Sequence, residues 1–143
     1  MNENGYTNGY IERRQGGRYD GRLTIEGVDI SPIDAMFFRD KEKRTDYLWL
    51  KRKPMLDYDD QQHKYVQRQR KPIWEAYLKK SKDGSIAYRG TFAFLRFRYE
   101  IFAQWDRDIT QDDKFKRLNL YVERLPMNEQ TIINQIKDNN NDK

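Results

Sequence analysis

Basic and aromatic side chains interleave in residues 91–105, TFAFLRFRYEIFAQW. Arg96 and Arg98 stand between Phe94 and Phe102, all at even-numbered positions. Guanidinium groups contact phosphates and flat rings stack on unpaired bases, so this combination is typical of surfaces that hold single-stranded nucleic acid. Aromatic residues and arginine are also enriched at the energetic centres of protein–protein interfaces. The stretch therefore favours a binding role, toward either a nucleic acid or a protein partner.

Further basic residues lie next to aromatic ones at three places in the sequence. One cluster follows Trp49, one precedes Trp74, and a single arginine follows Tyr88. Each cluster falls on a predicted strand or at its end, where it can contact a phosphate backbone. The candidate backbone contacts are Lys51, Arg52, Lys53, Arg68, Arg70, Lys71 and Arg89.

Catalytic and metal chemistry finds little support in the composition. The chain has no cysteine and one histidine, His63, which excludes disulfides, thiol catalysis and two-histidine metal centres. No glycine cluster ends in the Gly-Lys-Ser/Thr of a phosphate-binding loop. Aspartates gather at 57–60 and 106–113, but neither segment follows the spacing of a calcium loop. We therefore expect no enzymatic activity, no cofactor and no metal site.

The net charge of +5 is concentrated in the middle of the chain. Residues 39–105 hold seventeen basic and nine acidic side chains, a net charge of +8. A basic centre between near-neutral ends indicates a surface that faces a polyanion. The alternative is a solvated, lysine-rich face without a ligand.

The elements that position these residues are predicted to be strands. In residues 91–105 the odd positions from 93 onward are all apolar, whereas the even ones carry the charges, which predicts one long, half-buried strand. Asp83-Gly84 separates two alternating apolar runs and predicts a hairpin turn there. The ten tyrosines, seven phenylalanines and three tryptophans also favour strands.

Two helices are predicted in addition. Ser31-Pro32 before the apolar cluster 33–38 has the form of a helix N-terminus, and Ile132, Ile133 and Ile136 form the apolar stripe of a short C-terminal helix. The predicted fold is mainly β: a small, strongly curved antiparallel sheet or an OB-like barrel of about six strands, with these two short helices. It comprises a flexible Gly/Tyr/Asn/Arg arm at 1–21, one globular domain at 22–138 and a frayed tail at 139–143.

No apolar run approaches the roughly 18 residues that span a bilayer, so we expect no membrane association and a cytoplasmic location. The sequence thus predicts a non-enzymatic domain that prefers single-stranded nucleic acid. The alternative is a protein-interaction or assembly subunit, for example a phage structural or inhibitor protein, which docks through the same surface and forms homo-oligomers. A covering of Phe94, Arg96, Arg98 and Phe102 by the C-terminal helix would remove the surface on which both hypotheses depend.

Overall fold

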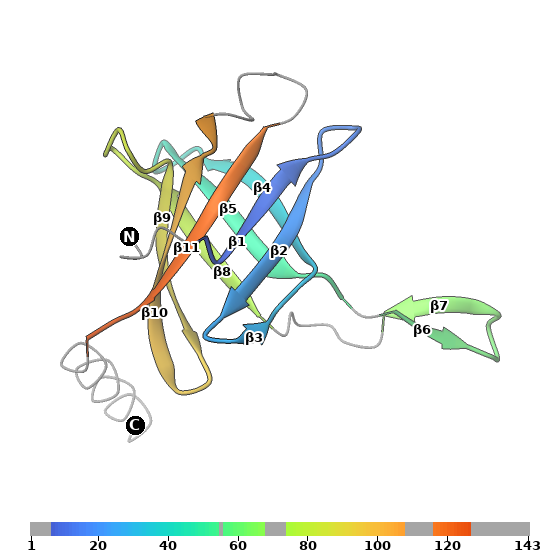
Figure 1. Ribbon diagram of the computed structural model, residues 1–143. Coiled ribbons are helices and arrows are strands. Elements are labelled where there is room, and N and C mark those ends of the chain that lie inside the picture. The colour runs from blue at the N-terminus through green and yellow to red at the C-terminus, as the bar shows by residue number, and fades with distance from the viewer. Residues whose placement is uncertain (1–6, 55, 68–73, 108–115, 127–143) are drawn as a thin grey trace, which may run out of the picture.

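The computed structural model describes residues 7–54, 56–67, 74–107 and 116–126. They form a closed antiparallel barrel of eight strands and a two-stranded hairpin that projects from it (Figure 1). The barrel strands are β1 (Gly9–Arg13), β2 (Tyr19–Ile25), β4 (Ile33–Asp40), β5 (Thr45–Arg52), β8 (Glu75–Lys80), β9 (Tyr88–Phe94), β10 (Phe97–Trp105) and β11 (Arg117–Arg124). A short strand, β3 (Val28–Asp29), pairs with the end of β2, and the projecting hairpin consists of β6 (Leu56–Asp59) and β7 (Lys64–Gln67).

The barrel is an up-and-down meander. Each barrel strand pairs with the next one along the chain, and β1 closes the sheet by pairing with β11 in the register Gly9 to Leu120 and Ile11 to Leu118. The prediction of a barrel is confirmed. The predicted count of six strands is wrong. The barrel is also not an OB-fold, because an OB-fold is a five-stranded Greek key, whereas these eight strands follow one another around the barrel.

Side chains fill the barrel, as expected for eight strands. Ile11, Leu48 and Leu118 are among the residues with no solvent exposure in its centre. Aromatic clusters lie toward both ends of this core, where consecutive rings are 4.9–6.5 Å apart. One cluster consists of Trp74, Phe92 and Tyr99, and the other of Tyr19, Phe37, Tyr88 and Trp105.

The single strand predicted over residues 91–105 is wrong, because the chain reverses in the middle of it. Phe94 pairs with Phe97, and only Leu95 and Arg96 connect β9 to β10. Their φ angles of 54° and 94° are both positive, as a type I′ turn requires. The reversal shifts the inward-facing set from even positions on β9 to odd positions on β10.

The helix predicted over residues 31–38 is also wrong. Ile33–Asp40 is β4, which pairs with β5 along its whole length, from Ile33 opposite Arg52 to Asp40 opposite Thr45. The Ser31-Pro32 peptide bond is cis. Eight residues of cross-strand pairing outweigh the local signals of a helix N-terminus. The predicted C-terminal helix lies outside the described residues.

Much of the segment 1–21, predicted to be a flexible arm, belongs to the barrel instead. Residues 9–13 form β1, and β2 begins at residue 19. Gly9 and Gly21 lie where β1 and β2 approach closely: a Cβ atom would be 2.0 Å from the Arg22 carbonyl oxygen at Gly9, and 1.8 Å from the Tyr10 carbonyl oxygen at Gly21. These glycines permit packing rather than flexibility. The hairpin predicted at Asp83-Gly84 is confirmed, since it connects the adjacent strands β8 and β9.

Candidate functional site

The four residues predicted to form one binding face are distributed over several environments. Phe94 faces inward and packs against the core, whereas Arg96 lies in the turn. Arg98 is on the outer face of β10 and donates a hydrogen bond to Thr91 Oγ1 at 3.1 Å. Phe102 also faces outward, yet only 4% of it is exposed. These side chains therefore do not form a common platform.

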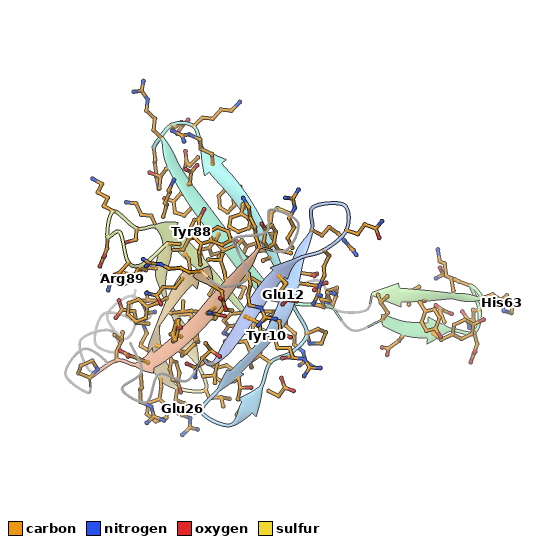
Figure 2. The ribbon with its side chains drawn as sticks, turned by 45° about the horizontal axis from the view of Figure 1, so that its top comes forward. Tyr10, Glu12, Glu26, His63, Tyr88 and Arg89 are labelled. Atoms are coloured by element: carbon orange, nitrogen blue, oxygen red, sulfur yellow. The ribbon has the colours of Figure 1, made fainter. Side chains whose placement is uncertain are left out.

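Arg89 is engaged on the same outer face. Its guanidinium lies 4.8 Å from the centre of the Phe102 ring, and its Nε is 3.0 Å from a carboxylate oxygen of Glu100. Figure 2 shows Arg89 beside Tyr88 at the start of β9. An arginine that is already paired with a carboxylate and stacked on a ring is a poor candidate for a phosphate contact.

The three basic residues at 51–53 lie in different environments. Lys51 is on the outer face of β5, with Nζ 4.6 Å from the centre of the Trp49 ring. The backbone N–H of Arg52 donates to the carbonyl of Trp74, while Lys53 forms ion pairs with Asp20 at 3.1 Å and Asp34 at 3.6 Å. Of the three, Lys51 lies over a half-buried ring of the outer face, that of Trp49. The other predicted contacts, Arg68, Arg70 and Lys71, lie outside the described residues.

A different set of rings covers the outer face of three adjacent strands. We call these residues the aromatic wall: Phe38 on β4, Tyr47 and Trp49 on β5, and Tyr77 on β8. Phe38 and Tyr47 are directly opposite each other and their rings stack 5.3 Å apart. Trp49 and Tyr77 are likewise opposite, with parallel rings 5.7 Å apart. The wall is therefore a continuous cross-strand cluster of rings.

Two rings of the aromatic wall are open to solvent, and the other two, Tyr47 and Trp49, are half-buried. Tyr77 is 50% exposed and Phe38 is 39% exposed, and Met36 beside them is 54% exposed. The indole N–H of Trp49 donates to Glu75 at 3.0 Å, which fixes that ring and occupies the carboxylate. Exposed apolar side chains scattered singly are ordinary on a protein surface, but a contiguous cluster of this kind is a candidate interaction site.

Cations border the wall. Residues 34–53 and 75–83, which span β4 from Asp34 onward, the β4–β5 turn, β5 and β8, hold ten basic and six acidic side chains, a net charge of +4. Asp46 pairs with Arg39 and Lys80, and Asp40 accepts two backbone N–H groups of its own turn. In the part of the chain that the structure describes, Lys51 and Lys79 have no carboxylate partner within ion-pair distance.

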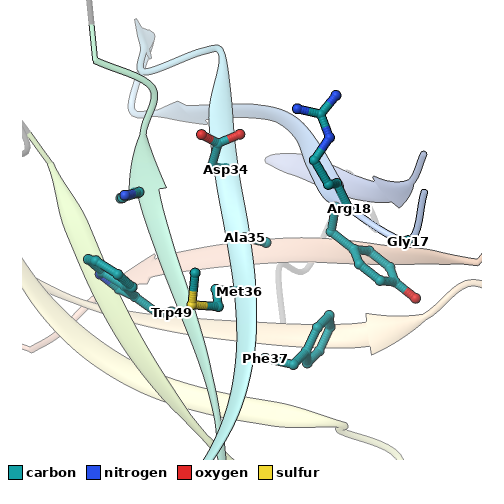
Figure 3. Close-up of a pocket in the computed structure, with 9 residues that line it drawn as sticks. Gly17, Arg18, Asp34, Ala35, Met36, Phe37 and Trp49 are labelled. Atoms are coloured by element: carbon teal, nitrogen blue, oxygen red, sulfur yellow. The ribbon is translucent and has the colours of Figure 1, made fainter. Parts of the chain in front are cut away.

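A cleft of about 470 Å³ adjoins the wall along β4. Met36 and Trp49 lie on one side of β4 in this cleft, while Arg18 and Phe37 lie on the other (Figure 3). The cleft opens where β2 begins, because Tyr19, the first residue of β2, pairs with Ala35, and β4 continues beyond that pair. We call it the β4 cleft, and its lining residues are Gly17, Arg18, Tyr19, Asp34, Ala35, Met36, Phe37, Trp49 and Lys51.

Ion pairs next to the β4 cleft leave a positive balance in it. Lys53 contacts Asp34, the one acidic residue in the lining, and also contacts Asp20. Burial by itself raises the pKa of Asp20, but hydrogen bonds from Arg14 and Lys53 outweigh it and hold that pKa below its ordinary value. Burial raises the pKa of Tyr19, so its hydroxyl is neutral at physiological pH. The cleft thus offers two cations, Arg18 and Lys51, against one carboxylate that already has a partner.

Comparison of the chain with protein-family models, with curated proteins and with solved structures found no match. Among the residues that the structure describes, no helix is long and apolar enough to cross a membrane. The same residues contain no group of three or more His, Asp or Glu side chains suited to hold a metal ion. His63 lies at the tip of the β6–β7 hairpin, away from the barrel (Figure 2).

Sequence reasoning missed the aromatic wall, although a signal for it exists. In β5 both alternating sets are apolar, with Leu48 and Leu50 buried and Tyr47 and Trp49 on the other face. A strand with two apolar sets is buried on both faces or carries an exposed patch. The first possibility makes the rings part of the core, and the second makes them a surface cluster, which is the arrangement on β5.

Proposed function

We propose that this protein binds single-stranded nucleic acid through the aromatic wall. The observation that carries the proposal is a cluster of four rings on three adjacent strands, two of them exposed and two half-buried, bordered by lysines without carboxylate partners among the described residues. Bases stack on exposed rings with little sequence preference, and cations beside the rings contact the phosphates. A barrel wall is open along its length, so a flexible strand can follow it.

Each part of the wall has a role in this proposal. The rings of Tyr77 and Phe38 offer stacking surfaces to successive bases, because they are the most exposed of the four. Trp49 is held by Glu75 and stacks on Tyr77, which gives the site a fixed ring at little entropic cost. Lys51 and Lys79 contact the phosphates on either side. The role is binding, without catalysis or a cofactor.

Fluorescence anisotropy with labelled 20-nucleotide DNA and RNA single strands tests the proposal. Tyr77→Ala removes one stacking ring and is expected to weaken binding about 5- to 150-fold, since a stacked base contributes about 1–3 kcal/mol. Tyr58→Ala is the matched control, because Tyr58 is also 50% exposed but lies in the β6–β7 hairpin. Equal affinities of the two variants, or no binding at low salt, would refute the proposal.

Salt dependence gives a second, independent readout. Affinity for a single strand falls with salt by a slope of about 0.7 for each phosphate contact on a log–log plot. Lys51→Gln and Lys79→Gln are each expected to reduce that slope by about 0.7, whereas Lys64→Gln in the hairpin leaves it unchanged. A slope that none of these substitutions alters would place the phosphate contacts elsewhere.

A further inference from the structure

Part of β4 is an open strand edge. β2 covers only Ile33 to Ala35, where Tyr19 pairs with Ala35, and the chain before Tyr19 turns away through Gly16-Gly17. From residue 36 to residue 40, β4 pairs with β5 on one side and with no strand of the described chain on the other. A closed barrel otherwise removes such edges, so this opening needs a reason.

The hydrogen-bond pattern identifies the groups at that edge. Lys53 N–H donates to the Pro32 carbonyl, so residues 32 and 53 form a hydrogen-bonded pair in the β4–β5 ladder. Such pairs alternate in an antiparallel ladder, and the even-numbered residues of β4 therefore direct their backbone groups toward β5. Phe37 and Arg39 direct their N–H and C=O groups the other way, into the open edge. These groups are available to an added strand.

The β4 cleft provides space beside this edge. Its volume of about 470 Å³ is within the range of ligand-binding pockets, and it is lined by Tyr19 and Phe37 where the edge begins. A strand that pairs with Phe37 and Arg39 places every second side chain toward these two rings. The site thus combines backbone hydrogen bonding with an aromatic subsite, which is how strand addition obtains both affinity and specificity.

The charges around the edge select the partner. Arg18 and Lys51 line the cleft, and the turn that follows β4 carries Lys41, Lys43 and Arg44 with one glutamate. A second copy of this chain paired through the same edge would bring its own basic turn onto Arg18, and like charges disfavour that arrangement. An acidic segment from another protein complements the edge. We propose that the β4 edge binds an extended, acidic peptide segment of a partner protein by strand addition.

The test uses the full chain and a labelled ten-residue peptide of alternating valine and glutamate. A peptide of equal length and charge with proline at every third position is the control, because proline cannot supply the ladder hydrogen bonds. Anisotropy titrations are expected to show at least tenfold tighter binding of the alternating peptide. Equal binding of both peptides would mean attraction by charge alone and would overturn the proposal.

Two variants at one position separate the backbone from the side chain. Arg39→Pro removes the outward N–H and leaves the β4–β5 ladder complete, so it is expected to weaken binding of the alternating peptide at least tenfold. Arg39→Ala keeps the N–H and is expected to change affinity less than threefold. An equal effect of the two variants, or no effect of proline, contradicts strand addition.

Amide hydrogen exchange measured by NMR locates the contact and needs no variant. The alternating peptide is expected to slow exchange of the Phe37 and Arg39 amides at least tenfold, while the Phe38 amide, which faces β5, changes little. A single-stranded oligonucleotide serves as the competing ligand. If the oligonucleotide protects these two amides and the peptide does not, the cleft belongs to the nucleic-acid site and the proposal is wrong.

Discussion

Leu95 and Arg96 connect β9 to β10 with φ angles of 54° and 94°, although neither residue is suited to positive φ. The left-handed region costs a residue with a Cβ atom about 1–2 kcal/mol, because Cβ approaches the following carbonyl oxygen. Asparagine tolerates this region and glycine carries no penalty in it, which is why Asn-Gly is the preferred pair for a type I′ turn. The native turn is therefore held by the strands on either side of it.

We expect the double substitution Leu95→Asn with Arg96→Gly to raise the free energy of unfolding by about 1.5 kcal/mol. Relief of strain at two positions contributes roughly 2–3 kcal/mol, and the larger entropy of glycine in the unfolded chain offsets about 1 kcal/mol of it. Leu95 is 66% exposed, so its removal leaves no cavity. With a denaturant slope of about 1.5 kcal/mol per molar, the urea midpoint rises by about 1 M.

Urea denaturation followed by tryptophan fluorescence measures this change. The control is Leu95→Ala with Arg96→Ala, which removes the same side chains but keeps the Cβ atoms at positive φ, and is expected to give no gain. A stabilisation of equal size in the alanine pair would show that the exposed leucine, rather than backbone strain, is the source. No gain in the Asn-Gly variant would refute the reasoning from backbone conformation.

Two further predictions concern the packing of β1 on β2 and the pH dependence of stability. Gly21→Ala places a Cβ 1.8 Å from the Tyr10 carbonyl oxygen and is expected to destabilise the barrel by about 3 kcal/mol. The control is Gly84→Ala, whose Cβ meets nothing within 4 Å and which should change the free energy of unfolding by less than about 0.5 kcal/mol. Thermal unfolding of both variants checks this, and similar melting temperatures would contradict it. The hydrogen bond from Arg124, assisted by one from the Tyr99 hydroxyl, holds the pKa of Glu26 below its ordinary value. The ionised carboxylate of Glu26 therefore stabilises the folded protein above pH 4.5, the ordinary pKa of a glutamate. This stabilisation is lost as the pH falls through the pKa that Glu26 has in the folded protein. The stability difference between wild type and Glu26→Gln, measured by urea denaturation at pH 7 and pH 3, should therefore shrink at the lower pH, and a difference that grows there would be inconsistent with this assignment.

The sequence allowed a correct prediction of a curved, mainly antiparallel β fold, because its strongest signals are local. The Asp83-Gly84 turn depends on near neighbours and corresponds to the observed connection of β8 to β9. The β9–β10 reversal was missed because a two-residue turn without glycine or asparagine leaves no compositional mark. Ala93 and Leu95 are apolar although they are exposed, and they continued the odd-numbered apolar set across the turn.

The aromatic wall could not be predicted because it depends on which strands are neighbours. Phe38 and Tyr77 are 39 positions apart in sequence, yet their rings are 6.4 Å apart on the folded barrel. Their proximity follows from the placement of β5 between β4 and β8, with the β6–β7 hairpin excluded from the barrel sheet. By contrast, Phe94 and Phe102 are close in sequence, yet Phe94 faces the inside of the barrel and Phe102 faces the outside. Spacing along one strand was therefore a poor guide to a shared face.

The seam between β1 and β11 also sets the order in which the chain acquires its structure. Every other barrel pairing joins neighbours along the chain, whereas Glu12 and Arg117, which bond across the seam, are 105 positions apart. At about 5–20 residues per second, a ribosome needs roughly 5–20 s to proceed from one to the other. During that interval β1 can pair with β2 while its second edge stays open. Barrel closure therefore waits for β11, the last barrel strand to be synthesised, and a chain truncated before residue 117 keeps an exposed edge that invites aggregation.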